Sequence, residues 1–191
     1  MRNQRNGMEA NLVMATGDVN FMMTEKKGEA MQTVTVAIAD IDPGRRRKLE
    51  QFLQDGPGIT VLGNVMPNGN SQYIEPEAGT HAHFEAMDDI VAKVSEARPR
   101  ILFIDLDYSR EGDFALLEAV HRESPGTLVL LLADKSAREE QILQGLANGA
   151  RGCLSHEADP LYFVKAVRVV DQGEIWVTRR MLGKIMDKVL H

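Results

Sequence analysis

Two aspartates each end a run of apolar residues, and a pair of carboxylates placed in this way could do chemistry. Asp40 follows the run 34–39, and Asp105 follows the run 101–104. Short apolar runs of this kind are typical of buried parallel strands. If the strands are adjacent, the carboxylates meet at the edge of an α/β sheet where sites lie. Two acids there can hold a divalent cation such as Mg²⁺, accept a phosphoryl group, or both.

Two further acids, Asp42 and Asp107, lie two residues beyond these aspartates and are candidate members of the same acidic pocket. Asp42 also has a second interpretation. It precedes Pro43, and this pair is typical of a helix N-cap followed by the first helical position. Ser136 and Glu139 have the spacing of a capping box at the start of a later helix.

The elements that must position the acids alternate between strand and helix. Apolar runs predict further strands at 59–62, 128–132 and 151–155. Amphipathic or capped segments predict helices at 43–54, 84–96, 113–123, 136–148 and 159–173. Five strand–helix units in succession predict an α/β fold with a doubly wound parallel sheet. A short extended stretch and an extra C-terminal helix from about residue 178 follow.

Composition limits the classes of protein to which this chain could belong. The chain has 191 residues, a formal net charge of -6 and a single cysteine, Cys153. The net charge argues against a nucleic-acid-binding surface. One cysteine forms no internal disulfide, and no apolar run reaches the length of a membrane span. We therefore expect a cytoplasmic protein with no membrane partner.

The domain boundaries follow from the same pattern. Residues 1–31 lack periodicity and are predicted to be a disordered N-terminal tail. Residues 32–173 form the predicted α/β domain, which includes a polar, turn-rich surface insertion at 64–83. Residues 174–191 form a predicted linker and sixth helix.

Several segments resemble the receiver domain of two-component response regulators, of the NarL/LuxR type. They are 39–43, Arg98-Pro99 leading to Asp105, 131–133, Gly149-Ala150-Arg151-Gly152 and Gly173-Glu174-Ile175-Trp176. The resemblance covers about residues 33–180 and implies the flavodoxin-like (βα)5 receiver fold. It implies phosphoryl transfer from a partner histidine kinase to Asp105, with Mg²⁺ held at Asp40 and Asp105.

Three positions depart from the pattern of this family. Ile41 stands where the family has a second acid, Leu132 where it has Ser or Thr, and His156 where it has Lys. The chain therefore resembles a degenerate receiver, or pseudo-receiver. We expect it to be no enzyme and to act through protein–protein contacts with a histidine kinase or another protein. We interpret Arg45, Arg46 and Arg47 on the first helix as a solvated face or a partner-docking patch.

Two alternative functions remain open. Trp176, Thr178 and Arg179 resemble the Trp-x-Thr/Ser-Arg motif of extended receivers that bind cyclic di-GMP, in which an aromatic plane stacks on guanine. Asp105-Leu106-Asp107 resembles the Asp-x-Asp motif of haloacid-dehalogenase-type phosphohydrolases.

The apolar residues of the predicted C-terminal helix lead us to expect a homodimer. It carries an apolar stripe formed by Met181, Leu182, Ile185, Met186, Val189 and Leu190. Regulators of the NarL/LuxR type continue into a helix-turn-helix domain, whereas this sequence ends at His191. We therefore expect no DNA binding by this chain and expect the stripe to pack on the domain or on a second copy.

Overall fold

A single sheet, all of whose strands run parallel, forms the frame of the molecule. The computed structural model describes residues 13–14, 32–67, 81–107 and 114–190. Across the sheet the strand order is β1-β7-β6-β5-β4-β2-β3. The strands are β1 (Val13–Met14), β2 (Val34–Ala39), β3 (Ile59–Asn64), β4 (Ile101–Asp105), β5 (Leu128–Ala133), β6 (Gly152–Ser155) and β7 (Trp176–Val177).

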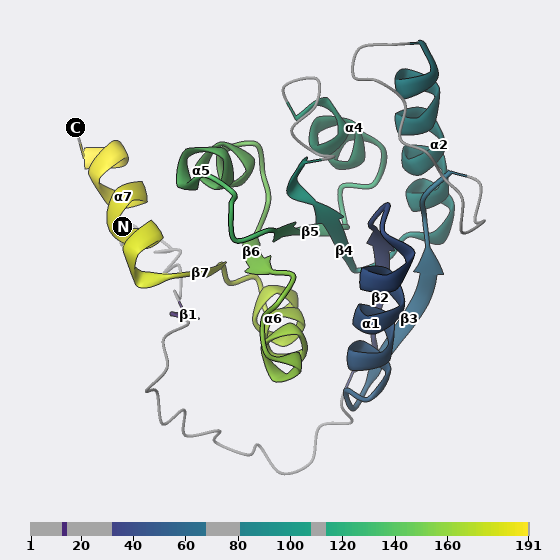
Figure 1. Ribbon diagram of the computed structural model, residues 1–191, viewed down its shortest axis with the longest axis horizontal. Coiled ribbons are helices and arrows are strands. Elements are labelled where there is room, and N and C mark those ends of the chain that lie inside the picture. Colours follow the sequence, from purple (N-terminus) through teal and green to yellow (C-terminus); the bar gives the residue numbers. More distant parts are fainter. Residues whose placement is uncertain (1–12, 15–31, 68–80, 108–113, 191) are drawn as a thin grey trace, which may run out of the picture.

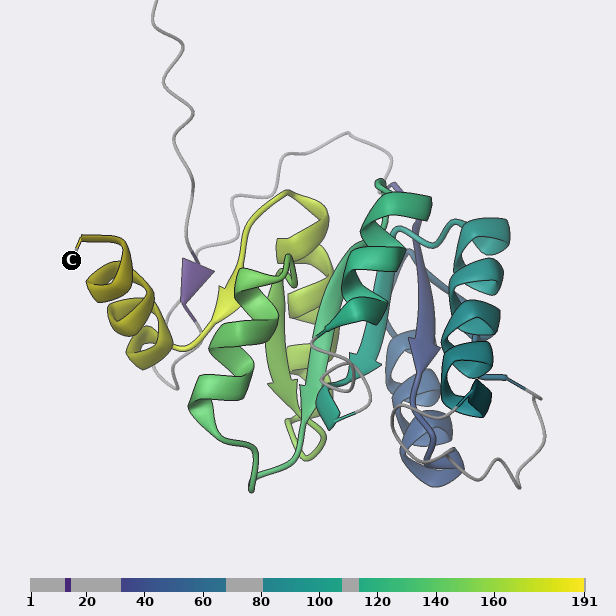
Figure 2. The same ribbon diagram turned by 90° about the horizontal axis from the view of Figure 1, so that it is seen from above.

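Helices cover both faces of the sheet. They are α1 (Pro43–Gln54), α2 (His81–Ala97), α4 (Ala115–Glu123), α5 (Glu139–Ala147), α6 (Pro160–Asp171) and α7 (Arg179–Leu190). Helices α1 and α6 lie on one face, and α2, α4 and α5 lie on the other (Figure 1). The view from above in Figure 2 places α7 at the end of the molecule farthest from α2. The predicted fold class, a doubly wound parallel α/β sheet with an extra C-terminal helix, is confirmed.

The core consists of two apolar layers, one on each face of the sheet. Ile90 of α2 and Leu117 of α4 belong to one layer, and Leu53 of α1 and Val167 of α6 belong to the other. Every residue of β4 is buried, because helices cover it on both sides. This two-sided burial explains why the strand reads as an uninterrupted apolar run that ends on Asp105.

Two predicted boundaries differ from the structure. Val13 and Met14 pair in parallel with β7, so the prediction of a disordered tail over 1–31 is wrong for these two residues. The predicted insertion at 64–83 is shorter at both ends. Val65 and Met66 are buried in the core, and α2 begins at His81. Strand pairing and buried apolar residues therefore extend into segments whose overall composition is polar. Residues 68–80 of the predicted insertion lie outside the described part of the chain.

The helix starts are set by local hydrogen bonds. Asp42 caps α1, since its side chain accepts from the backbone N–H groups of Gly44 and Arg45 at 2.7 and 2.8 Å. The predicted capping box at Ser136 is wrong. The residues before α5 form a turn, and the backbone N–H of Arg138 instead donates to the side chain of Gln141 at 3.2 Å.

The C-terminal segment packs against the domain. Gly152 of β6 lies so close to β7 that a Cβ atom there would be 2.5 Å from the carbonyl oxygen of Trp176. Glu139 of α5 forms ion pairs with Arg180 and Lys184 of α7, which hold that helix beside α5. Among the described residues, no helix is both long and apolar enough to cross a membrane.

Candidate functional site

Asp40 and Asp105 lie side by side at the carboxyl ends of adjacent strands. Ala39 pairs with Ile104 in the register of β2 and β4, so the next residue of each strand is one of the two acids. The strand order reverses at this pair, because β2 has β3 on its other side. Ligands of open α/β sheets bind at this kind of switch point. The sheet therefore brings the two predicted acids together, and both are buried.

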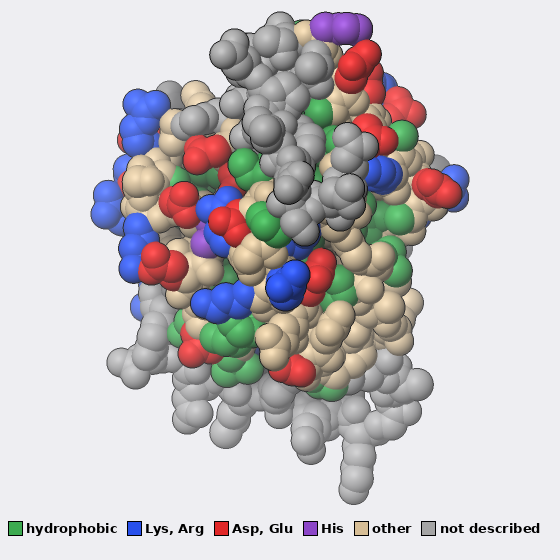
Figure 3. All heavy atoms as spheres, turned by 45° about the vertical axis from the view of Figure 1, so that its right-hand side comes forward, with side chains coloured by type: hydrophobic (Ala, Val, Ile, Leu, Met, Phe, Trp, Pro, Cys, Tyr) green, Lys and Arg blue, Asp and Glu red, His purple; other side chains and the backbone are tan. Residues whose placement is uncertain are grey.

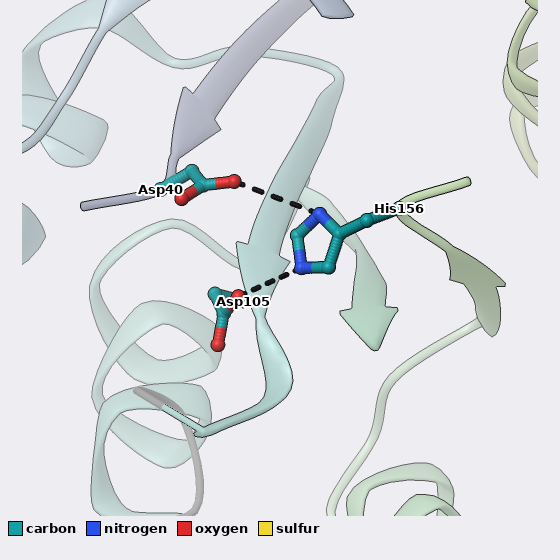
Figure 4. A group of neighbouring side chains, drawn as sticks. All are labelled: Asp40, Asp105 and His156. Carbon is teal, nitrogen blue, oxygen red and sulfur yellow. Dashed lines mark hydrogen bonds and ion pairs between the residues drawn. The ribbon is translucent and has the colours of Figure 1, made fainter. Parts of the chain in front are cut away.

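His156 joins the two acids from the loop after β6. Its Nε2 donates to Asp105 Oδ2 at 2.8 Å, since a carboxylate oxygen can only accept. Its Nδ1 lies 3.7 Å from Asp40 Oδ2, so the ring sits between the two carboxylates (Figure 4). The His156 side chain is only 8% exposed. The imidazole is therefore a fixed part of the pocket.

Arg45 reaches the same pocket from the first turn of α1. Its Nη2 lies 3.1 Å from Asp40 Oδ1 and 3.2 Å from Asp105 Oδ2, and its Nη1 lies 3.5 Å from Asp134 Oδ1. The interpretation of Arg45 as a solvated face or docking patch is therefore wrong. A signal was present in the sequence: Asp42 starts the helix, which places residue 45 above the strand ends. Sequence reasoning missed it because the reach of a long side chain is not visible in a pattern.

Burial and the nearby cations shift the carboxyl pKa values in opposite directions. Burial raises the pKa of Asp40, and the backbone N–H of Asp42 and the charge of Arg45 offset only part of that effect. Burial also opposes ionisation of Asp105, but the hydrogen bond and charge of His156, together with Arg45, outweigh it and lower the pKa of Asp105. The acids of the pocket raise the pKa of Arg45 despite its burial. Arg45 is therefore always charged in the pocket.

The other two predicted acids do not place a carboxylate in this cluster. Asp42 is exposed, and its side chain caps α1. Asp107 is also exposed and contributes its backbone N–H, which donates to Asp105 Oδ1 at 2.8 Å. The expected acidic pocket is thus smaller than predicted, because caps and backbone contacts account for both residues.

The remaining positions that depart from the receiver pattern are apolar. Ile41 packs against the core on the side of α2. Leu132, at the end of β5, is buried and lines the pocket with Asp40, Asp134 and His156. Neither side chain can donate or accept a hydrogen bond at the site.

Asp40, Asp105 and His156 form a group that could hold a metal ion. Each offers one ligand atom, and these atoms lie within 4.8 Å of one another. Mg²⁺ requires near-ideal octahedral oxygen coordination. Here one of the donors is a nitrogen, and Arg45 already contacts both carboxylates. The arrangement therefore fits Mg²⁺ poorly while Arg45 remains in place.

The residues of the cyclic di-GMP motif do not form an open site. The Trp176 side chain is 7% exposed and lies beside the ring of Tyr162, with a centroid distance of 6.3 Å. Thr178 Oγ1 accepts from the backbone N–H of Met181 at 3.3 Å, so it caps α7. Arg179 is exposed. The structure thus offers packing and capping roles for Trp176 and Thr178.

The Asp-x-Asp pair is also separated. A phosphohydrolase of that type needs both carboxylates at the reacting group. In this chain Asp105 belongs to the buried cluster, whereas Asp107 is exposed and lies in the helical turn after β4. This arrangement does not favour the phosphohydrolase alternative.

Comparisons with known proteins identify similarities in structure. No protein-family model matches the sequence, and no curated protein matches it. Among solved structures, the signal receiver domain of the response regulator NarL from Mycobacterium tuberculosis is 19% identical, with a TM-score of 0.57, and the match covers 75% of this chain and 99% of that one. The isolated receiver domain of RcsB from Salmonella enterica serovar Typhimurium, in the presence of the phosphomimetic BeF3-, is 15% identical, with a TM-score of 0.58. The match covers 78% of this chain and 96% of that one.

A third structure of the same type is a LuxR family DNA-binding response regulator from Silicibacter pomeroyi. It is 23% identical, with a TM-score of 0.53, and the match covers 77% of this chain and 98% of that one. At these identities the likeness concerns the fold alone, and it agrees with the parallel strand order of the sheet. The fold of this chain is that of a NarL/LuxR-type response-regulator receiver domain.

Proposed function

We propose that this chain is a degenerate receiver module that signals through contacts with other proteins and is not an enzyme. The observation that carries the proposal is the state of Asp105, the residue that resembles the phosphoryl acceptor. Its Oδ2 accepts from His156 and Arg45, and its Oδ1 accepts from the backbone N–H of Asp107. Both oxygens are therefore engaged within the chain.

This arrangement opposes phosphoryl transfer to Asp105. A carboxylate that shares its electron density with several donors is a weaker nucleophile, and phosphoryl transfer also needs cations placed to neutralise the phosphoryl charge. Ile41 provides no second acid, and Leu132 provides no hydroxyl to contact a phosphoryl oxygen. We therefore expect a histidine kinase or a small phosphodonor to modify Asp105 poorly, and we expect signalling to depend on binding to a protein partner.

Mg²⁺ at Asp40 and Asp105 has a limited place in this proposal. When bound, the ion would neutralise phosphoryl charge. To bind there, it must take oxygens that Arg45 contacts at 3.1 and 3.2 Å. We therefore propose that the affinity of the unaltered chain for Mg²⁺ is low.

The surface is compatible with protein contacts. Figure 3 shows acidic and basic side chains intermixed on the face it presents. Two large apolar side chains are exposed in neighbouring positions at the start of α6, Leu161 at 56% and Tyr162 at 38%. Met186 of α7 is 46% exposed. We propose that such positions serve protein partners, including a second copy of this chain.

Intact-mass spectrometry after incubation with acetyl phosphate and MgCl2 tests the proposal. We expect little or no phosphorylated protein. The comparison variant Ile41→Asp/Arg45→Ala/Leu132→Thr/His156→Lys supplies the three missing groups and removes the guanidinium that contacts the acids. This variant should become phosphorylated, and a further Asp105→Asn change should abolish the phosphorylation. Stoichiometric, long-lived modification of Asp105 in the unaltered chain would overturn the proposal. If the comparison variant folds and stays unmodified, the missing groups are not the cause.

A further inference from the structure

The guanidinium of Arg45 is the centre of an ionic cluster that spans three strand ends. It contacts Asp40 after β2, Asp105 at the end of β4 and Asp134 after β5, at 3.1, 3.2 and 3.5 Å. Without it, the buried carboxylates of Asp40 and Asp105 would face each other and repel, whereas Asp134 lies at the exposed margin of the pocket. A charge shared among carboxylates at strand ends is what a bound divalent cation supplies in other sites.

The backbone around Arg45 holds this residue in place. Asp42 fixes the first turn of α1 by accepting from the backbone N–H of Arg45 at 2.8 Å. The next residue, Arg46, donates from Nη1 to the backbone carbonyl of Asp40 at 2.9 Å. The first contact fixes the cap of α1, and the second fastens this helix to the residue that follows β2. The Arg45 side chain therefore starts from a fixed position beside the acids.

We propose that Arg45 is the resident cation of this pocket and excludes divalent metal ions from a site that Asp40, Asp105 and His156 would otherwise form. The positive charge of an arginine persists at all physiological pH values, so only another cation can replace it. A metal ion must compete for the same oxygens that Arg45 contacts. Removal of this one side chain should therefore create a metal site where the unaltered chain has almost none.

The role of Arg45 deepens the low Mg²⁺ affinity stated under the proposed function, but it can be tested apart from phosphorylation. Its test measures cation binding with no phosphodonor present. Strong metal binding by the unaltered chain would contradict the role of Arg45 and still permit a degenerate receiver. Phosphorylation of Asp105 would contradict the proposed function and leave the cation measurement unchanged.

The experiment is a titration with Mn²⁺, which reports binding by electron paramagnetic resonance and by isothermal calorimetry. The variant Arg45→Gln removes the charge in the pocket. Arg47→Gln is the matched control, because it removes the same charge from an exposed position of the same helix. We expect Arg45→Gln to bind one Mn²⁺ with an affinity about tenfold or more above that of the unaltered chain. Arg47→Gln should behave like the unaltered chain.

The ligands of the new site can be tested in the same way. The double variant Arg45→Gln/Asp105→Asn should lose most of the gained affinity, since it removes one carboxylate of the pocket. If folded Arg45→Gln binds no better than Arg47→Gln, the inference is wrong. The same conclusion follows if the unaltered chain already binds one Mn²⁺ as tightly as the variant does.

A second variant covers the case in which Arg45→Gln does not fold. Arg45→Lys keeps one positive charge but loses the fork that contacts three carboxylates. It should bind Mn²⁺ more tightly than the unaltered chain, because one flexible, strongly hydrated ammonium group holds the carboxylates less firmly than the planar guanidinium does. Equal affinities for Arg45→Lys and the unaltered chain would overturn the inference.

Discussion

Arg45 contacts both buried acids, Asp40 and Asp105, so it matters for stability as well as for cation binding. The side chain of Arg45 is 31% exposed, and that of Asp40 is 1% exposed. Removal of one partner of a buried ion pair leaves an uncompensated charge. Because Arg45 is partly solvated, the effect should be smaller than for a fully buried pair.

The stability of Arg45→Gln should therefore depend on pH. The pKa of Asp105 is lowered, so its stabilising contribution is present above the ordinary carboxyl pKa and is lost as pH falls through the folded value. Burial raises the pKa of Asp40, so ionisation of this residue costs stability as pH rises through the folded value. Loss of Arg45 weakens the stabilisation that comes from ionised Asp105 and increases the cost of ionising Asp40. We expect a loss of about 1–3 kcal/mol at neutral pH and a smaller loss at about pH 4.

Urea unfolding at the two pH values measures this difference. Arg47→Gln again serves as the control and should change little at either pH, because its side chain is exposed. An equal loss at both pH values for Arg45→Gln would show that packing, and not charge, explains the contribution of Arg45.

At the scale of single residues, the sequence was informative where position along a strand determines the result. Asp40 and Asp105 were placed correctly beside each other, because each directly ends a buried strand. His156 was placed at the site only through the family resemblance. The role of Arg45 was missed, because three carboxylates far apart in the sequence define it.

At the scale of elements, the close contact between β6 and β7 makes a sharp prediction. A Cβ atom at Gly152 would lie 2.5 Å from the carbonyl oxygen of Trp176 and 2.7 Å from its Cβ atom. Since a backbone atom cannot move aside alone, Gly152→Ala should displace β7 and lower stability by about 1–3 kcal/mol. Thermal unfolding measures the loss, and hydrogen exchange should increase in β7 and α7.

Gly126→Ala is the matched control for this change. A Cβ atom at Gly126 would meet no atom within 4 Å. This variant should therefore keep the stability and the exchange rates of the unaltered chain. If Gly152→Ala behaves in the same way, the two strands are less tightly held than their contact indicates.

Periodicity in the sequence predicts which helices and strands are present, but it predicts less accurately where each one begins and ends. The helix from Pro43 to Gln54 was predicted correctly, because the Asp42 cap and Pro43 mark its start. The start of α5 was placed too early, since a turn uses the residues at 134–137. The pairing of Val13 and Met14 with β7 could not be predicted, because a two-residue strand has no measurable period.

At the scale of the whole molecule, the apolar stripe of α7 divides between two environments. Met181 is buried in the domain, whereas Met186 is 46% exposed. The helix therefore uses part of its stripe within the chain and leaves part available. The side chains of Val189 and Leu190 lie outside the described residues. The predicted homodimer stays a prediction, with Met186 as its most accessible contact on this helix.

Sedimentation of the full chain tests the dimer. We expect association at about tens of micromolar, and we expect Met186→Glu to shift the protein toward monomer, because a charge in an apolar contact opposes its burial. Leu62→Glu is the control. Leu62 is 44% exposed and belongs to β3, at the opposite edge of the sheet. A chain that sediments as a monomer at these concentrations would show that the dimer prediction is wrong.

The pairing of β1 with β7 has a consequence for how the molecule meets other strands. Val13 and Met14 occupy the hydrogen-bonding side of Trp176 and Val177 that would otherwise be the outer edge of the described sheet. An unpaired edge can recruit a strand from another molecule. Because β1 is tethered to the same chain, its effective concentration at this edge is of the order of millimolar. A competing strand must overcome this advantage, so a shortened chain that starts at β2 would associate through an edge that the longer chain keeps occupied.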